Sequence, residues 1–503
     1  MRLVWKLSIV LLAAGVLSAQ EYRATIVGTV TDPTGASVPI AKAIAANIET
    51  GVSSSTETGT DGNFVIPFLV PGNYSLRVEK AGFKTTDRGP IQLRVNDRTR
   101  IDVRLDVGQS TDTVTVTAEA PLLETASSSR GQVVDQRVIA DMPLNSRNPF
   151  TLMNIATGVN YTNSLLYFRP FDNGAIGYFS INGGQNGLNT FQIDGAPNDA
   201  SNAGSQLAYV PPVEATQEFK IQSNIYDAQY GRTSGGVVNV SIKPGTNKFH
   251  GAVYEYLRRT PLNANPFSQN AAGAPRAQHP IDQYGWEFDG PVRIPKVYNG
   301  RDRTFFMFSQ ERYKEFTPQP ATETVPTALQ RAGDFSQTYK SATQLYTIYD
   351  PLTVSLNPAY NPAQSITAAN TQYIRQAFPS NQVPQNRMKQ IALNVLKDIP
   401  LPNQPGQAYT QLQNYYGGNV GEATDFQNLI ARVDHSFSDK WRMYGRWNHN
   451  FRDGGRIDYN GWGTPATSII HAGRKNDGAV IDAVGTLSPR TILDLRISYM
   501  RYH

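Results

Sequence analysis

The stretch EATQEFKIQSNIYDAQYGRTSGGVVNVSIKPGTNKFHG, which runs from Glu214 to Gly251, decides how the chain is organised. It contains a short strand over 218–222 and a β-branched strand over 237–242, with the pairs Tyr230-Gly231 and Gly235-Gly236 between them. Paired glycines near strands mark a bulge or a place where another backbone approaches closely. The chain before this stretch has the pattern of small domains, and the chain after it has long amphipathic strands. We interpret the stretch as the hinge between the two.

The composition favours a β-rich, turn-rich protein over a helical one. Charged residues make up 17% of the 503 residues, below the usual ~25%. The net charge of +5 is spread along the chain without a Lys/Arg run, so nucleic acid is not an expected partner. The chain has no cysteine, which rules out a disulfide framework and a thiolate metal site.

The N-terminus has the pattern of a secretory signal peptide over residues 1–19. Arg2 and Lys6 form its positive region, residues 7–17 form a short apolar run, and Ala19 is a small residue suited to cleavage. No later stretch reaches the ~18 apolar residues that a membrane helix needs. Such a chain can enter a membrane only as a closed β-barrel, because lipid cannot pair with backbone polar groups.

Residues 22–108 have the pattern of a small β-sandwich, with short alternating strands and turn signals between them. They resemble the carboxypeptidase regulatory-like domain, which has a transthyretin-like or carbohydrate-binding-like fold. The matching segments are 28–35 with Val38-Pro39, 62–64, 71–74 and Gly82-Phe83. The resemblance implies the fold and carries no peptidase site. Tyr74 and Phe83 are expected to fill the core rather than to bind sugar.

A β-branched linker over 109–121 follows the sandwich. Its central segment resembles the TonB box of outer-membrane transporters, which an inner-membrane energy transducer captures. Such a strand gains main-chain hydrogen bonds by pairing with another chain. Two alternatives stay open, namely a strand of the first domain and a plain linker. The residues of the TonB-box-like strand are Asp112, Thr113, Val114, Thr115, Val116, Thr117 and Ala118.

Residues 122–247 have the pattern of a compact mixed α/β unit with Asn-Gly and Asp-Gly turns. The order of its short motifs resembles the plug of TonB-dependent outer-membrane receptors, and most closely the Oar-like subgroup, which carries a carboxypeptidase regulatory-like domain in front. The motif residues are Asn182, Gly183, Asp194, Gly195, Glu218, Phe219, Tyr230, Gly231, Gly235, Gly236 and Asn239. The resemblance runs from about residue 22 to past residue 313.

Residues 248–503 have the alternation of transmembrane barrel strands, with short turns on one side and a long extracellular loop over about 314–425. A soluble sandwich also alternates, but the strand length and a polar face rich in Arg and Asn favour the barrel. Within 440–448, one face carries Trp441, Met443 and Trp447, and the other carries Arg442, Tyr444, Arg446 and Asn448. The expected strands lie near 250–259, 283–293, 303–313, 427–437, 440–450, 477–487 and 490–502.

The resemblance implies about 22 strands around a plugged lumen, which need about 220 residues for the strands alone. Fewer strands are readable here, and an open sheet would leave bare edges in lipid. The sequence is therefore expected to be a fragment or a truncated product of a longer chain.

We find no catalytic or metal-binding constellation. The six histidines, none in a metal-ligand pattern, are His250, His279, His435, His449, His471 and His503. Asp194 is interpreted as a turn residue rather than a cation ligand. No cofactor is expected, and the chain is not expected to be an enzyme.

The favoured function is that of a TonB-dependent receptor or transporter of the cell outer membrane, with its N-terminal domain in the periplasm. The resemblance implies energy-coupled uptake of a large or scarce substrate. The sequence does not identify this substrate, and a carbohydrate, a peptide, a siderophore and cobalamin all stay open. It also implies two partners, a TonB-type inner-membrane energy transducer and outer-membrane lipid. One alternative is a surface glycan-binding or adhesion protein without transport. The least favoured is a secreted enzyme with a β accessory domain.

Overall fold

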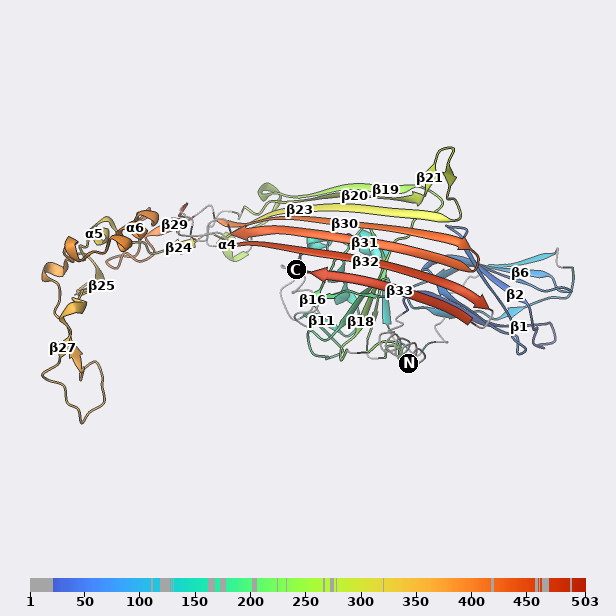
Figure 1. The fold of residues 1–503 in the computed structure, drawn as a ribbon, viewed down its shortest axis with the longest axis horizontal. Coiled ribbons are helices and arrows are strands. Elements are labelled where there is room, and N and C mark those ends of the chain that lie inside the picture. The colour runs from blue at the N-terminus through green and yellow to red at the C-terminus, as the bar shows by residue number, and fades with distance from the viewer. Residues whose placement is uncertain are drawn as a thin grey trace, which may run out of the picture.

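The computed structural model describes residues 21–109, 112–117, 127, 129, 131–161, 168–171, 178–200, 206–223, 225–231, 233–265, 267–271, 276, 278–319, 321–417, 420–456, 460, 462–463, 470–488 and 491–503. The expected signal peptide and linker residues 118–121 lie outside these ranges. The expected mainly β architecture is confirmed, with a sandwich, an α/β unit and a long antiparallel sheet following one another along the chain (Figure 1).

The N-terminal sandwich consists of two sheets that enclose an apolar core. One sheet has the order β4-β1-β7, with β8 also paired to β1, and the other has the order β3-β2-β5-β6-β9. Tyr74 is buried in this core and Phe83 packs against it, as the sequence predicts. The strands are β1 (Ala24–Thr31), β2 (Lys42–Asn47), β3 (Ser53–Glu57), β4 (Asn63–Leu69), β5 (Gly72–Glu79), β6 (Thr85–Leu93), β7 (Arg98–Arg100), β8 (Val103–Arg104) and β9 (Thr113–Thr117).

The α/β unit, here called the plug, is built on a five-stranded sheet of order β10-β17-β18-β13-β14. Alternate residues of β17, such as Phe219 and Ile221, face its apolar core, and two barrel residues, Met307 and Ile430, complete that core. Its sheet strands and helices are β10 (Gly131–Asp135), α2 (Gln136–Asp141), η1 (Asn145–Arg147), η2 (Pro149–Ile155), β13 (Thr190–Ile193), β14 (Ala196–Pro197), β17 (Thr216–Gln222) and β18 (Val237–Ile242). Short pairs form from β11 (Val159–Tyr161) with β12 (Phe179–Ile181) and from β15 (Asp199–Ala200) with β16 (Gln206–Leu207).

The third part is a seven-stranded antiparallel sheet, here called the barrel sheet, whose strands pair in chain order. All seven strands lie where the sequence predicts them, but several extend further. The connection between β23 and β30 therefore spans 319–420, a few residues less at each end than expected. The strands are β19 (His250–Arg258), β20 (Ile281–Pro291), β23 (Thr304–Pro318), β30 (Gly421–Ser438), β31 (Trp441–Arg456), β32 (Ile470–Ser488) and β33 (Thr491–Tyr502).

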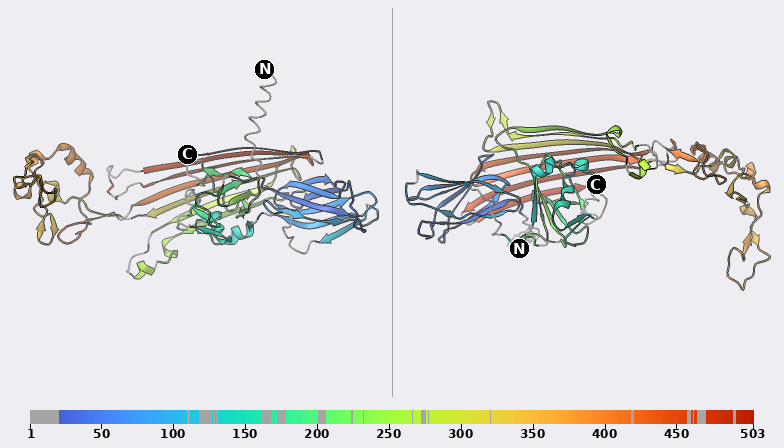
Figure 2. Two further views of the ribbon diagram at one scale, coloured as in Figure 1. Left: turned by 90° about the horizontal axis from the view of Figure 1, so that it is seen from below. Right: turned by 180° about the vertical axis from the view of Figure 1, so that it is seen from behind.

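The connections of the barrel sheet differ sharply in length between its two ends. Residues 439–440 join β30 to β31, and β33 begins at Thr491 shortly after β32 ends at Ser488, whereas 319–420 projects from the opposite end (Figure 1). This long connection carries small elements, among them α5 (Ala328–Arg331) and α6 (Gln390–Asp398). The sandwich lies at the short-turn end, and the plug lies between the two ends on one face of the sheet (Figure 2). Among the described residues, no helix is long and apolar enough to cross a membrane.

Candidate functional site: the plug and its contacts

The barrel sheet has one apolar face and one polar face. On β31, Trp441, Met443 and Trp447 are exposed, while Tyr444, Arg446 and Asn448 are buried. The buried face is the one that carries Met307 and Ile430 against the plug. The alternation predicted from the sequence is therefore confirmed, and the side chains on the buried face are those available to hold the plug.

The Asp194-Gly195 turn of the plug is clamped by arginines of the barrel sheet. Asp194 has a positive φ of 50°, and its carboxylate accepts a hydrogen bond from the Ile242 amide at 3.0 Å. Arg432 lies 3.3 Å from one carboxylate oxygen and Arg446 lies 3.3 Å from the other, with all three side chains fully buried. Arg496 donates to the Gly195 carbonyl at 3.2 Å.

This clamp explains the Asp-Gly turn without a cation. A carboxylate removed from water needs charged or hydrogen-bonding partners, and here guanidinium groups supply them. Tyr444 adds a hydrogen bond from its hydroxyl to the Asp194 carbonyl at 3.1 Å. Within the part of the chain that the structure describes, no group of three or more His, Asp or Glu side chains is arranged to hold a metal ion.

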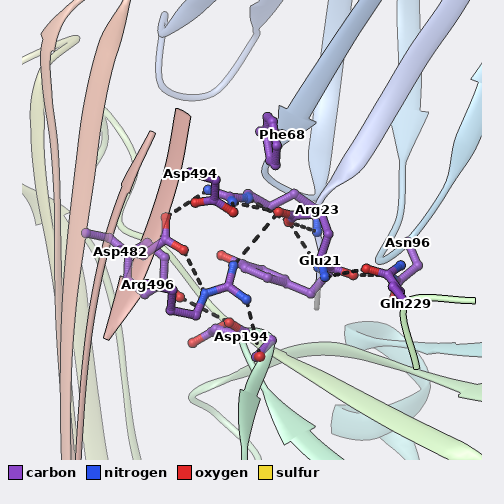
Figure 3. Close-up of polar contacts among 12 residues, drawn as sticks. Glu21, Arg23, Phe68, Asn96, Asp194, Gln229, Asp482, Asp494 and Arg496 are labelled. Atoms are coloured by element: carbon purple, nitrogen blue, oxygen red, sulfur yellow. Dashed lines mark hydrogen bonds and ion pairs between the residues drawn. The ribbon is translucent and has the colours of Figure 1, made fainter. Parts of the chain in front are cut away.

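A second charged cluster joins the start of the sandwich to the barrel sheet (Figure 3). Arg23, directly before β1, lies 2.7 Å from Glu21, 2.9 Å from Asp482 and 2.9 Å from Asp494. Arg496 donates to Asp482 at 2.7 Å, so the same arginine contacts this cluster and the plug turn. Burial alone would raise the pKa of Glu21, but the guanidinium of Arg23 holds that pKa below its ordinary value.

The turn over residues 94–97 of the sandwich, here called the 94–97 turn, docks on the plug. The Val95 amide donates to the Glu218 carboxylate, and Lys220 donates to Asp97 at 3.1 Å. Asn96 donates to the Tyr230 hydroxyl at 2.8 Å and accepts from the Asn239 side chain at 3.2 Å. Three motif residues of the plug, Glu218, Tyr230 and Asn239, thus meet at one contact with the N-terminal domain.

The environment of Glu218 is unusual for a carboxylate. Its side chain lies on β17 and is almost completely buried. Burial raises the pKa of Glu218 from the ordinary 4.5 to about 7, with the charge of Asp97 acting in the same direction. The Val95 amide, Arg94 and Lys220 oppose this shift.

The glycines of the plug motifs are of two kinds: some lie in close contact with neighbouring atoms, and others lie in turns with open space around them. A Cβ on Gly236 would lie 2.7 Å from both the Gln222 carbonyl and the Ile181 side chain, and one on Gly235 would lie 2.1 Å from Asn189. The tight packing expected at this pair is therefore present. Gly231 has nothing within 4 Å of such a Cβ. The Asn182-Gly183 pair forms a turn after β12 at positive φ.

The TonB-box-like segment lies on the sandwich. Residues Thr113–Thr117 form β9, which pairs in parallel with β6 from Thr85↔Thr113 to Gly89↔Thr117. β9 is the last strand of its sheet, and the described side chains of 112–115 are half-buried or exposed. Ala118 lies outside the described residues. The alternative of a strand of the first domain matches this placement, which does not test capture by a transducer.

The sequence did not predict which residues the plug motif residues contact. The arginines of the barrel sheet were visible as a polar face, but nothing in their spacing connects Arg432 to Asp194, 238 residues away. The 94–97 turn and Arg23 carried no recognisable motif. A possible signal for the turn was the Asn96-Asp97 pair between two strands, since Asn and Asp favour turns and tolerate positive φ.

Comparisons with known proteins agree with this architecture. The family model described as outer membrane beta barrel domain matches residues 241–503, and the carboxypeptidase regulatory-like domain matches residues 25–106. The chain is 30% identical over 258 residues to the TonB-dependent transporter Oar of Myxococcus xanthus, a match that covers 49% of this chain and 23% of that relative. The chain thus spans less than a quarter of this curated relative.

Matches among solved structures include two outer-membrane proteins. The outer membrane transporter YddB of Escherichia coli has a TM-score of 0.41 at 11% identity, over 74% of this chain and 38% of that one. The ferric enterobactin receptor PfeA of Pseudomonas aeruginosa has a TM-score of 0.39 at 11% identity, over 74% of this chain and 41% of that one.

Proposed function

The chain belongs to the outer membrane beta barrel domain family, which its residues 241–503 match, and from this membership we propose that it acts as a TonB-dependent outer-membrane receptor or transporter. Its role is energy-coupled uptake of a large or scarce substrate through a plugged barrel. The apolar face of the barrel sheet contacts lipid. The proposal includes no chemical step and no cofactor.

The observation that carries the proposal is the plug seated on the polar face of the barrel sheet, with Asp194 between Arg432 and Arg446. Buried ion pairs add little net stability compared with apolar packing, but they are costly to break singly. Such a contact holds the plug in one defined position. The Asp194 carboxylate and the two guanidinium groups can also be solvated by water once the plug moves away. This property suits a plug that must shift to open a path for the substrate through the barrel.

The orientation follows from the two ends of the barrel sheet. Outer-membrane barrels have short periplasmic turns and longer extracellular loops. The long connection 319–420 therefore faces the outside, where it meets the substrate, which is a carbohydrate, a peptide or a siderophore. The sandwich at the short-turn end then faces the periplasm. This placement disfavours the alternative of a surface glycan-binding protein, because such a role needs the sandwich on the cell surface.

The TonB-type transducer is proposed to capture the strand 112–118. Isothermal titration of the purified protein with the periplasmic domain of a TonB-type transducer tests this step. Binding is expected with the intact protein and is expected to be lost when 112–118 is replaced by a Gly/Ser segment of equal length. Equal binding by both proteins would show that this strand is not the captured segment. A protein that fractionates away from the outer membrane would contradict the proposal as a whole.

A further inference from the structure

The strand proposed for capture and the plug are joined by one continuous piece of the N-terminal domain. β9 pairs in parallel with β6 along its whole length, and β6 ends at Leu93. The next four residues are the 94–97 turn, which is docked on β17 and β18 of the plug. No flexible linker separates the strand that receives a pull from the turn that holds the plug.

We infer that the N-terminal domain is a lever that transmits a pull on β9 through β6 and the 94–97 turn to the plug strands β17 and β18. The inference rests on the proposed function, since it takes β9 as the captured strand. It gives the N-terminal domain a specific role, in which Asn96 and Asp97 are positioning residues for the plug.

The first step of the lever is the β6–β9 ladder. Hydrogen bonds in a sheet run across the strands, so a pull along β9 loads all of them together rather than opening them one at a time. β6 is further paired with β5, inside the sheet that forms one side of the sandwich core. A pull on β9 therefore moves this sheet as a unit before it strips β9 away.

The second step is the grip of the 94–97 turn on the plug. Val95 is fully buried, and Glu218, Lys220 and Asn239 are at most 6% exposed. Charged groups at such depth depend on their partners, and the turn supplies them through the Val95 amide and Asp97. Tyr230 also donates to the Glu21 carbonyl at 2.8 Å, so the start of the domain is tied to the same point. Movement of the turn therefore uncovers the polar face of the plug sheet.

Hydrogen–deuterium exchange of the full chain in detergent micelles tests the lever without a transducer or a substrate. Proline replaces Val114 in one variant and Thr115 in another. In a strand, neighbouring amides point to opposite edges, so only one of these prolines removes a bond to β6, and the other is its matched control. The proline that breaks the ladder is expected to speed exchange of the β17 and β18 amides about tenfold, while the control leaves them unchanged.

Asn96→Ala combined with Asp97→Ala completes a double-mutant cycle. This double substitution alone is expected to speed exchange of the β17 and β18 amides. Adding the ladder-breaking proline to it is expected to have no further effect, because the contact between the 94–97 turn and the plug has already been removed. Full additivity would overturn the lever. The lever would also be overturned if the ladder-breaking proline removes protection from the β6 amides but leaves exchange of the β17 and β18 amides unchanged. Unchanged exchange in β1 and β4 serves as the check that each sandwich is folded.

The exchange cycle can be scored separately from the capture step of the proposed function. If the transducer does not bind 112–118 but the exchange cycle shows coupling, the capture step fails and the coupling between β9 and the plug stands. If the transducer binds and the cycle is additive, the lever fails and the proposed function stands.

Discussion

The carboxylate of Asp194 in the plug and the guanidinium of Arg432 in β30 lie 3.3 Å apart, and neither side chain is exposed to solvent. Arg432 also donates to the Ile242 carbonyl at 2.9 Å, at the end of β18. One barrel arginine therefore grips the plug at its Asp-Gly turn and at the strand that leads out of it. In the proposed function, the strength of this grip determines how easily the plug moves.

Removing the Asp194 carboxylate is expected to loosen the plug strongly. Asp194→Ala leaves Arg432 and Arg446 without a carboxylate partner in the plug, and breaking one side of a buried ion pair costs roughly 3–5 kcal/mol. The free energy of local opening of β18, measured by hydrogen exchange, is expected to fall by this amount. Arg77→Ala, which removes an exposed ion pair with Asp87 in the sandwich, serves as the control. Equal exchange of β18 in all three proteins would contradict the clamp.

The two glycine positions of the plug motif are expected to respond differently to alanine. Gly236→Ala places a methyl group 2.7 Å from the Gln222 carbonyl, and overpacking of this kind costs about 1–3 kcal/mol. Gly231→Ala meets nothing within 4 Å and is expected to be neutral. Thermal unfolding of the two variants beside the unchanged protein measures the difference, and similar midpoints for both would contradict the close packing at Gly236.

The strands and their two faces were predictable where the local sequence pattern determines them. The alternation of Trp441, Met443 and Trp447 with Arg442, Tyr444 and Arg446 fixes the two faces of β31, because side chains alternate in any strand. The Gly235-Gly236 pair indicated close packing for a different local reason, namely that glycine has no side chain and lets another backbone approach. Strand ends were less predictable, since pairing with β30 continues β23 to Pro318 through residues without strong alternation.

The contacts of the candidate site were not predictable, because they join residues far apart in the chain. Glu218, Tyr230 and Asn239 were singled out as plug motif residues, yet their partner turn at 94–97 lies in another domain. The parallel pairing of Thr113 with Thr85 was only one of three readings of that linker. One sequence by itself contains no signal that links such distant positions.

A charge placed on the outer face of the barrel sheet is expected to destabilise it according to depth. Ile481 lies near the middle of β32 and is exposed, and Leu487 is exposed near the short-turn end. Ile481→Arg is expected to cost about 2–4 kcal/mol in lipid, and Leu487→Arg about 0–1 kcal/mol. Urea unfolding from lipid vesicles measures both, and equal costs at the two positions would argue against a membrane-spanning β32.

The 94–97 turn is expected to open from the plug more easily as the pH rises, because the ionised Glu218 carboxylate is better solvated in the open state than when it is buried under the turn. Burial raises the pKa of Glu218 to about 7, against 4.5 for an ordinary glutamate. Between these values the folded protein binds more protons at this site than the unfolded chain, so stability falls with rising pH. The contribution is fully present below about 4.5 and is lost above about 7.

Exchange of the Val95 amide, which donates to Glu218, reports this pH dependence directly once the intrinsic effect of pH on exchange is removed. Glu218→Gln keeps the shape and the acceptor oxygen but cannot ionise, so its protection is expected to stay constant across the same range. Asp97, Arg94 and Lys220 face the same carboxyl. Because the charge of Asp97 raises the pKa of Glu218, the Asp97→Asn variant is expected to lose protection at a lower pH than the unchanged protein does. A pH profile that is identical with and without the Glu218 carboxyl would assign the effect to another group.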